Sequence, residues 1–381
     1  MKFRLKQIAS AILTGCILFT IAACGGKHPS HAPAPEGRRV EMRHAQLLRI
    51  IEADDATTLV EIVNPWDTTK FLGKYALIER GKETPTSIPD VYMRINVPLE
   101  RSVVYSGLHS SVIAELGGIG QVNGVCDVAY ISDSLTSERV SNGKIIDCGS
   151  NYSPNLEKIL SLKPDAVILS PYENSQDLDK FRRIGLTPVE AADYMEATPL
   201  ARAEWIRLFG RLYGNKEGAD SIFNQVEKDY NSLKRLASSS AERPKVLIDR
   251  IYSGVWDVPT SGSVTGIMIE DAGGRNPFNS YKDGGAAHLA PEEVLMKAGE
   301  ADIWLVRYAE PKLSIDDLRK ENALYARIRA LTNGRVYGAN TIGSGLFEDA
   351  TFHPEKVLRE MIILFHPESV NGPLKYYHKL Q

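Results

Sequence analysis

Short strand-like segments alternate with helix-like segments along most of this 381-residue chain. In the first half, strands are predicted at 103–105, 122–125, 145–146, 166–169 and 188–189, and helices at 110–116, 155–162 and 177–184. In the second half, strands are predicted at 245–249, 303–306 and 336–337, and helices at 264–272, 291–298, 315–331 and 354–365. This alternation is typical of parallel sheets that are covered by helices. The sequence therefore predicts an α/β protein with two such regions.

A helical stretch separates the two regions. Between residues 217 and 238, apolar side chains recur every three or four positions, at Ala219, Ile222, Phe223, Val226, Tyr230, Leu233 and Leu236. This spacing predicts one apolar face on a helix roughly 33 Å long. We expect an N-terminal lobe at 41–196, connecting helices at 197–240 and a C-terminal lobe at 241–381.

The N-terminus has the pattern of a secretory signal that ends in a lipidation site. Three basic residues lie within the first six positions, and an apolar run that is too short to span a membrane follows at 8–23. The Ala-Ala-Cys ending resembles the lipobox of bacterial lipoproteins, which implies cleavage of residues 1–23 and a lipid on Cys24. The alternative is an ordinary signal peptide with a chance cysteine. Residues 24–40, rich in Gly and Pro, are interpreted as a flexible tether.

The composition and the missing motifs argue against several classes of protein. Charged residues make up 24% and hydrophobic residues 43%, as in soluble globular proteins. No block of basic residues points to a nucleic-acid partner, and no second apolar run reaches the roughly 18 residues of a spanning helix. Nucleophile-elbow, phosphate-loop, zinc-protease and Cys-x-x-Cys motifs are absent. We therefore expect no enzyme, no catalytic residue, no cofactor and no metal site.

Two further cysteines each follow a short apolar run. Cys126 follows the predicted strand 122–125, and Cys148 follows the apolar pair 145–146. If the two strands are neighbours, the sulfur atoms come within reach of a disulfide in an oxidising compartment. Two buried free thiols are the alternative.

Several stretches in a fixed order resemble one known family. They are residues 101–106, 120–127, 154–165, 269–276, 291–295, 301–303 and 332–337. Together they resemble the ABC-transporter substrate-binding proteins for ferric siderophores, haem and vitamin B12, over roughly residues 100–368. The resemblance implies two Rossmann-like lobes joined by a single long helix, with the ligand cleft between the lobes and little closure on binding. The strand-like segments at 59–63 and 75–78 lie outside the resemblance.

The resemblance also implies a function. The chain would be a membrane-anchored lipoprotein facing the periplasm or the cell exterior, a monomer that captures an iron chelate, either a ferric siderophore or haem. It would deliver this ligand to an ABC permease with its ATPase. Vitamin B12 is the alternative ligand in the same class. Two more functions stay open, namely a bare-metal binder for zinc or manganese and a two-lobed periplasmic metal chelatase acting on tetrapyrroles.

Candidate ligand contacts follow from the rule that ligands bind outside the carboxyl ends of parallel strands. In the two lobes these positions carry Tyr105, His109, Tyr130, Tyr152, Tyr172, Arg250, Tyr252, Trp256, Arg307 and Phe347. Flat rings suit a large planar or chelate ligand, and arginine suits its carboxylate or catecholate oxygens. A packing role is the alternative for each aromatic residue, and for His109 the alternative to binding iron is capping or packing.

Docking on the permease is a further implication of the resemblance. Its members use one acidic residue at the tip of each lobe, paired with permease arginines. Glu270 occupies that position in the second lobe. In the first lobe Ser111 stands there instead, and Glu115, one helical turn later, is expected to replace the missing acid.

Overall fold

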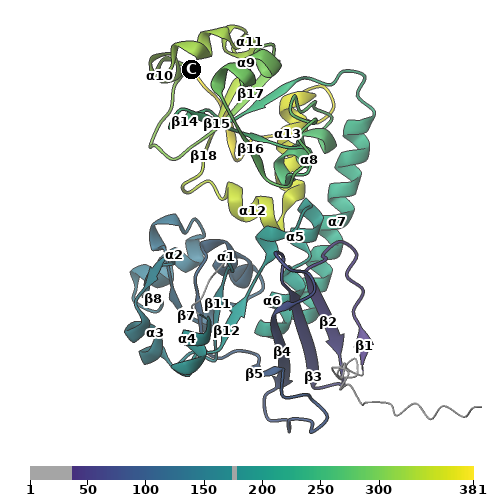
Figure 1. Ribbon diagram of the computed structural model, residues 1–381, viewed down its shortest axis with the longest axis vertical. Coiled ribbons are helices and arrows are strands. Elements are labelled where there is room, and N and C mark those ends of the chain that lie inside the picture. Colours follow the sequence, from purple (N-terminus) through teal and green to yellow (C-terminus); the bar gives the residue numbers. More distant parts are fainter. Residues whose placement is uncertain (1–36, 174–177) are drawn as a thin grey trace, which may run out of the picture. The chain divides into compact units, whose positions relative to one another are not determined.

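A five-stranded parallel sheet forms the centre of the first lobe (Figure 1). The computed structural model describes residues 37–173 and 178–381, so the signal peptide, Cys24 and most of the tether lie outside the described residues. The strand order is β12-β11-β6-β7-β8, with β6 (Ser102–Val104), β7 (Val122–Val125), β8 (Ile146–Asp147), β11 (Ala166–Leu169) and β12 (Pro188–Glu190). The helices of this lobe are α1 (Gly107–Glu115), α2 (Ser134–Ser141), α3 (Leu156–Leu162) and α4 (Leu178–Arg183). A two-stranded ribbon, β9 (Gly149–Ser150) with β10 (Ser153–Pro154), follows β8.

The second lobe repeats this plan with a shorter sheet of order β13-β17-β18-β19. Its strands are β13 (Val246–Ile248), β17 (Ile303–Tyr308), β18 (Val336–Asn340) and the antiparallel β19 (Tyr377–Lys379). Its helices include α8 (Val264–Asp271), α9 (Pro291–Ala298), α10 (Ile315–Glu321) and α11 (Arg329–Thr332). The helix expected at 315–331 is interrupted because Asn322 has an extended backbone and its side chain caps the next turn, accepting from the Leu324 amide at 2.9 Å.

An antiparallel sheet of three strands, absent from the sequence prediction, covers part of the second lobe. It consists of β14 (Ile251–Tyr252), β15 (Val255–Pro259) and β16 (Ala286–Leu289). The burial along β15 alternates, so that Trp256 and Val258 face the core of this lobe.

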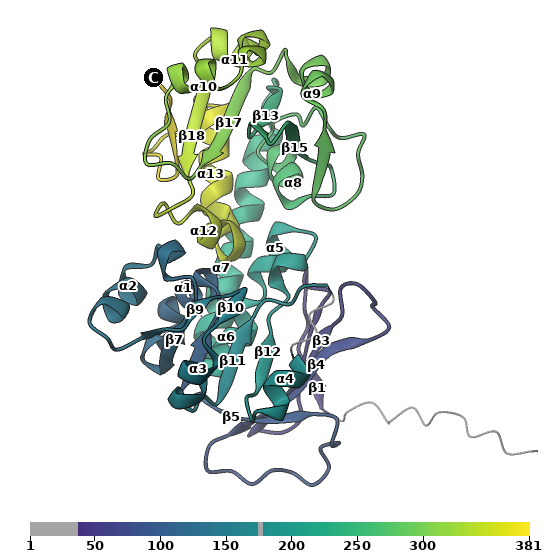
Figure 2. The same cartoon turned by 60° about the vertical axis from the view of Figure 1, so that its left-hand side comes forward.

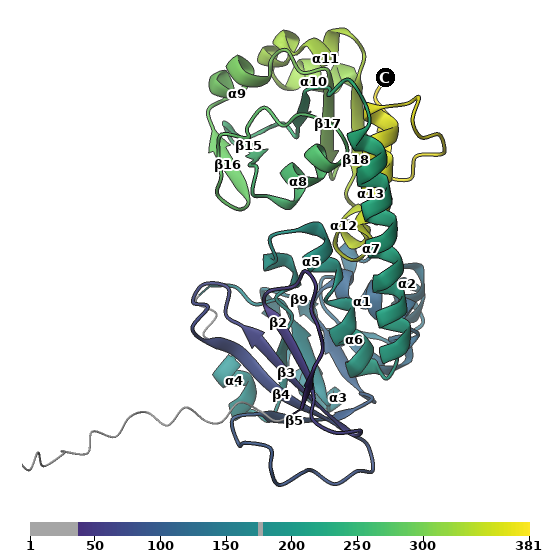
Figure 3. The same cartoon turned by 90° about the vertical axis from the view of Figure 1, so that its right-hand side faces the viewer.

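The predicted long helix is present as α7 (Lys216–Ser238) and runs along both lobes (Figure 3). The helices α5 (Pro199–Ala203) and α6 (Ile206–Tyr213) precede it, and left-handed Gly214 separates α6 from α7. Of the predicted stripe, Ala219, Phe223, Val226 and Tyr230 are buried, Ile222 and Leu233 are partly buried, and Leu236 is 40% exposed. Within residues 37–173 and 178–381, no helix has both the length and the apolar character needed to cross a bilayer.

The C-terminal segment reinforces this connection. Helix α13 (Pro354–Phe365) packs along α7, and α12 (Leu346–Phe352) contacts both α1 and α5. Figure 2 shows α5 and α12 at the level between the two lobes. The connection therefore consists of α7 together with packed helices of both lobes.

Residues 38–97, which the family resemblance leaves out, form a five-stranded sheet beside the first lobe. Its strands are β1 (Arg38–Arg39), β2 (Leu48–Glu52), β3 (Thr57–Val63), β4 (Phe71–Glu79) and β5 (Met93–Val97), paired in this order. Buried apolar residues of β2, β3 and β4 share one core with α6 and α7. The buried Glu204 carboxylate accepts from the amides of Arg43, His44 and Ala45 at 2.8–2.9 Å. The sheet is therefore an integral part of the first lobe.

Candidate ligand-binding cleft

A cavity of about 540 Å³ lies between the two lobes, where the sequence predicted a ligand cleft. The first lobe contributes the segment 194–197 and Arg202, and the second contributes Asp249, Arg307 and residues of the segments 257–265 and 284–286. This volume lies within the range of small-molecule sites. Both lobes thus supply walls of the same cavity.

Arg307, at the end of β17, is the principal cation on the second-lobe side. It pairs with Asp249, which follows the neighbouring strand β13, and its Nε donates to Asp249 Oδ1 at 2.9 Å. Burial alone would lower the pKa of Arg307, but the bond to Asp249 outweighs burial and raises the pKa above its ordinary value. The guanidinium is therefore a fixed positive charge at the cavity wall.

The backbone of Asp249 is held in an uncommon conformation. Its φ is 58°, in the left-handed region that a non-glycine residue occupies at a cost of about 1–3 kcal/mol. The Trp304 indole donates to the Asp249 carbonyl at 2.6 Å, and the Asp249 amide donates to the Leu305 carbonyl at 2.8 Å. These bonds fix the carboxylate that orients Arg307.

Arg202 of α5 provides a second cation from the first-lobe side. Its Nε donates to the carbonyl of Glu196 at 3.2 Å. Burial lowers the pKa of Arg202, and the negative charges of Asp193 and Glu196, which raise it, offset this effect only in part. The rule that ligands bind outside the carboxyl ends of strands did not predict Arg202, because this residue lies inside a helix and no sequence motif marks it.

The N-terminus of α8 also faces the cavity. Ser263 caps this helix by accepting from the Gly266 amide at 3.0 Å, and Gly262 to Thr265 line the wall. A Cβ at Gly266 would lie 1.9 Å from the Thr260 carbonyl oxygen, so this close approach requires glycine. The partial positive charge of a helix N-terminus favours anions. Together with the two arginines it offers donors to oxyanion groups, beside the carboxylates of Glu196, Asp249 and Asp257 in the same lining.

Among the predicted ligand contacts of the second lobe, Arg307 lines the cavity and Trp256 does not. Trp256 is fully buried, donates from Nε1 to the Ile248 carbonyl at 3.0 Å, and packs against Trp304 and Tyr325. The expectation that it contacts ligand is wrong, because the unpredicted strand β15 turns this side chain into the core.

The other three second-lobe residues also lie outside the set that lines the cavity. Arg250 is paired with Glu310 and, at 2.6 Å, with Glu321. Tyr252 is 83% exposed on the short ribbon. Phe347 is 46% exposed, and the Arg307 Cζ atom lies 5.9 Å from its ring centroid, which places Phe347 beside the cavity wall.

In the first lobe, Tyr105 and His109 are buried and cannot reach a ligand. His109 Nε2 lies 2.8 Å from Asp193 Oδ1, and its ring packs against Phe209 and Phe352. Tyr105 packs edge-on against Phe181. The structure thus corrects both expectations in favour of packing.

The remaining first-lobe tyrosines are exposed. Tyr130 follows β7, Tyr152 lies between β9 and β10, and Tyr172 follows β11, with exposed fractions of 69%, 91% and 54%. None of them lines the cavity. Their contact with a ligand stays a prediction.

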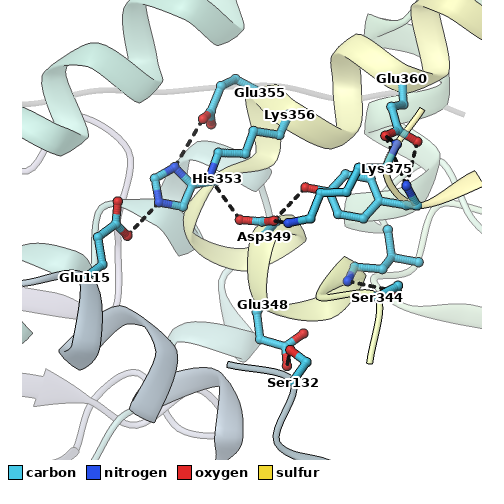
Figure 4. Close-up of polar contacts among 12 residues, drawn as sticks. Glu115, Ser132, Ser344, Glu348, Asp349, His353, Glu355, Lys356, Glu360 and Lys375 are labelled. Atoms are coloured by element: carbon cyan, nitrogen blue, oxygen red, sulfur yellow. Dashed lines mark hydrogen bonds and ion pairs between the residues drawn. The ribbon is translucent and has the colours of Figure 1, made fainter. Parts of the chain in front are cut away.

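The expected docking residue Glu115 is engaged in a contact between the lobes (Figure 4). Its Oε2 lies 2.7 Å from His353 Nε2 at the start of α13, and Glu355 Oε1 lies 3.1 Å from the other ring nitrogen. Ser132 of the first lobe donates to Glu348 of α12 nearby. Glu115 therefore links α1 to α13, while its side chain remains 36% exposed, and docking through Glu115 stays a prediction.

Glu270, the other expected docking residue, also has local partners. It accepts from the Asn276 amide at 2.9 Å and the Asn279 side chain at 2.7 Å, and it pairs with Arg243. Burial would raise its pKa, but these bonds outweigh burial and lower it. Its side chain remains 29% exposed, and docking through Glu270 stays a prediction.

The contact between His353, Glu115 and Glu355 predicts a pH-dependent stability. Burial would lower the pKa of His353, but the bonds to the two carboxylates raise it from 6.5 to about 9. Because the folded pKa is raised, the stabilisation is complete below the unfolded pKa and is lost as the pH rises through 9. We expect the melting temperature to fall between pH 7 and about 9.5 more steeply in the wild type than in His353→Gln. The exposed His288→Gln is the control and should follow the wild type. Melting temperatures that fall equally steeply in the wild type and in His353→Gln would contradict this prediction.

The disulfide between Cys126 and Cys148 is not present. The strands β7 and β8 are neighbours as expected, and the two residues follow paired positions, yet both thiols are buried and free. Burial raises the pKa of both thiols, that of Cys148 to about 11. We expect iodoacetamide to label neither residue in the native protein and both after unfolding without reductant. Peptide mapping would contradict this if the unfolded protein yielded a linked pair.

Comparison with known proteins extends these observations. The pattern of the periplasmic binding protein family matches residues 103–341, more than half of the chain. An uncharacterized lipoprotein of Methanocaldococcus jannaschii is 25% identical over 96% of this chain and 92% of its own length. The iron-uptake system-binding protein of Bacillus subtilis is 23% identical over 87% of this chain and 90% of its own length.

Solved structures share the fold. The periplasmic heme-binding protein of Roseiflexus sp. RS-1 is 24% identical, with a TM-score of 0.56 over 71% of this chain and 99% of its own. A periplasmic heme-binding protein from Pseudomonas aeruginosa is 18% identical, with a TM-score of 0.57 over 74% of this chain and 98% of its own. The 96% coverage by the archaeal lipoprotein means that its match includes most of the N-terminal sheet, which the family pattern leaves out.

Proposed function

This chain belongs to the periplasmic binding protein family, and we propose that it captures an anionic iron chelate between its lobes and delivers it to an ABC importer. The observation that carries the proposal is the pair of arginines, Arg202 and Arg307, which line one cavity from opposite lobes. A guanidinium group can bind two carboxylate or catecholate oxygens at once, and carboxylates and catecholates surround the iron in many chelates. The names of the iron-uptake relative and of the haem-binding structures support this class of ligand.

A ferric siderophore fits the cavity better than haem or cobalamin. Haem requires an axial ligand such as His or Tyr. Tyr194 is the lining residue of that type, and its hydroxyl already donates to the Pro171 carbonyl. Cobalamin carries little net charge and would offer few anionic oxygens to the two arginines, whose partners within the protein are Asp249 and the Glu196 carbonyl. A chelatase would need a histidine in the cleft, and the candidate for this role, His109, is buried in the first lobe.

Ligand titration tests the proposal. The wild-type protein is titrated with ferric citrate, a ferric catecholate, a ferric hydroxamate, haem and cobalamin, and binding is measured by calorimetry and by quenching of tryptophan fluorescence. We expect at least one ferric chelate to bind at micromolar concentration or below, with the metal-free chelator bound more weakly. Absence of binding for every ferric compound would contradict the proposal, and tight binding of cobalamin alone would establish the alternative.

We propose that the lipid on Cys24 holds the protein at the membrane, facing the periplasm or cell exterior. The name of the archaeal relative as a lipoprotein supports this, while Cys24 itself lies outside the described residues. Docking on the permease would use Glu270, whose ionised carboxylate remains partly exposed on the second lobe. The protein would act as a monomer, since both walls of the cavity come from one chain.

Replacing Cys24 tests the anchor. Two or three acyl chains give stable membrane binding, whereas a chain without them has no comparable attachment. We therefore expect Cys24→Ser to move the protein from washed membranes into the soluble fraction, as followed by immunoblotting. A variant that retains Cys24 but carries Cys148→Ser is the control and should stay with the membranes. Full retention of Cys24→Ser would contradict the anchor.

A further inference from the structure

A second cavity, of about 500 Å³, lies beside the N-terminal sheet and shares no lining residue with the interlobe cleft. Its walls come from β1, the chain between β1 and β2, α6 and the first turns of α7. Six of its lining residues are basic, namely Arg38, Arg39, Arg43, Arg207, Arg211 and Lys216. Three are acidic, namely Glu41, Glu52 and Asp220. The cavity is thus strongly basic, although the whole chain has a net charge of −3.

Two of the arginines are buried and only loosely paired with carboxylates, although one terminal nitrogen of each donates to a backbone carbonyl at 3.0 Å. Arg207 is 7% exposed and Arg211 is 5% exposed, and the Nε of each has no hydrogen-bond partner. The nearest carboxylate oxygen, Oδ1 of Asp220, lies 3.4 Å from Arg207 Nε and 3.5 Å from a terminal nitrogen of Arg211. These distances exceed the roughly 2.7–2.9 Å of a charge-assisted hydrogen bond. Asp220 Oδ1 also lacks a hydrogen-bond partner, so these ion pairs are loose and leave buried donors that a further acceptor would satisfy.

The carboxylates of the cavity cannot neutralise its cations. Glu52 is shared by Arg38, Lys216 and, at 3.5 Å, Arg211. Burial lowers the pKa of Arg211 more than the charges of Asp220 and Glu52 raise it. Within residues 37–173 and 178–381, the Arg39 side chain has no hydrogen-bond or ion-pair partner. Arg43 and Arg207 find further carboxylates outside the cavity lining, in Glu227 at 3.0 Å and Glu204 at 3.5 Å. The positive charge left for an external anion therefore lies chiefly with Arg39 and with the three cations that share Glu52.

We propose that this basic cavity binds a phosphate group, held by the buried guanidinium groups of α6 and by Arg39 and Lys216 at its opening. A phosphate presents several oxygens, which match converging arginine forks better than a single carboxylate does. The cavity has the volume of a small-molecule site, so a phosphate that carries a further group also fits.

An anionic lipid headgroup and free phosphate are the two sources of such a group. If Cys24 carries the lipid of the proposed function, Arg38 lies 14 positions after the anchor. A chain of this length spans at most roughly 50 Å, so the cavity remains close to the headgroups of the membrane.

Vesicle and calorimetric binding test the proposal and separate its sources. The mature chain from residue 24 with Cys24→Ser, which has neither the apolar signal run nor acyl chains, is sedimented with vesicles of phosphatidylcholine alone or mixed with phosphatidylglycerol. The same protein is titrated with inorganic phosphate. A headgroup site gives binding only to the mixed vesicles, and a site for free phosphate gives a calorimetric signal without a preference between the vesicles.

Two double variants with equal loss of charge provide the control. Arg39→Gln/Lys216→Gln removes cations at the cavity, and Lys228→Gln/Arg235→Gln removes exposed cations farther along α7. We expect the first pair of substitutions to weaken binding at least tenfold and the second to leave it within twofold of wild type. Both variants keep the buried arginines, and thermal unfolding verifies that they fold. No binding of wild type to either probe, or equal weakening in both variants, would overturn the proposal.

Discussion

Arg307→Ala weakens the binding of a ferric chelate about 10- to 100-fold, because a hydrogen bond to a charged group contributes about 1.5–3 kcal/mol. The substitution also leaves the Asp249 carboxylate unpaired in the cavity wall, where it repels an anionic ligand. Calorimetric titration measures the loss. Adding Arg202→Ala should weaken binding further, since this arginine lines the same cavity from the other lobe.

Arg250→Ala is the matched control for this prediction. Arg250 lies in the same lobe, but it pairs with Glu310 and Glu321 and does not line the cavity. Its removal should leave the dissociation constant within about twofold of wild type. Thermal unfolding verifies that the Arg307→Ala protein is folded at the temperature of the titration. Equal affinities in Arg307→Ala and the wild type would contradict the assignment of the cavity.

Trp256→Ala destabilises the protein by about 3–5 kcal/mol, the usual effect of truncating a buried tryptophan. The indole is fully buried and packs with ring centroids 6.1 Å from Trp304 and 5.7 Å from Tyr325. Truncation also removes the hydrogen bond to the carbonyl of Ile248, the last residue of β13, which precedes Asp249. Urea unfolding followed by circular dichroism measures the change.

Tyr252→Ala is the control for this effect. Tyr252 lies on β14, paired with the strand of Trp256, but it is 83% exposed. Its truncation should change the free energy of unfolding by no more than about 0.5 kcal/mol. A Trp256→Ala protein with wild-type stability would show that the indole is not a core residue. It would then return to the set of candidate ligand contacts.

The rule that ligands bind outside strand ends proposed both Arg307 and Trp256, but only Arg307 lines the cavity, and the difference lies in the sheet type. Arg307 ends a parallel strand whose pairing was correctly predicted from the β-α rhythm, so its position at the cleft followed. The chain after β13 forms an antiparallel ribbon instead. Alternation along β15 buries Trp256, and the turn signal for this ribbon is the dipeptide Ser253-Gly254, with φ of 49° and 81° between β14 and β15.

Long-range packing explains why the contacts of His109 and Glu115 could not be predicted from the sequence. Both lie on α1, whose existence the sequence predicted, but α1 packs against α12, a helix that was not predicted. The ring of Phe352 on α12 covers His109, and His353 just after α12 pairs with Glu115. Residues more than 200 positions apart in sequence meet here, and local periodicity carries no information on such contacts.

The N-terminal sheet was also predicted only in part from the sequence. The segments 59–63 and 75–78 were predicted as strands and form parts of β3 and β4. Their partners β2 and β5 were not predicted, and the parallel pairing of β5 with β4 depends on a connection of 13 residues between them. The basic cavity beside this sheet combines residues of β1, α6 and α7, so it emerges only when these elements are packed together.

Anomalous X-ray diffraction at the iron absorption edge tests the central claim most directly, because it locates the metal of a bound chelate independently of any variant. Crystals are grown with the ferric chelate that binds most tightly in the titration. We predict one iron peak inside the cavity between the lobes, with the chelate's anionic oxygens on Arg202 and Arg307. An iron peak outside this cavity, or a chelate that contacts neither arginine, would contradict the account.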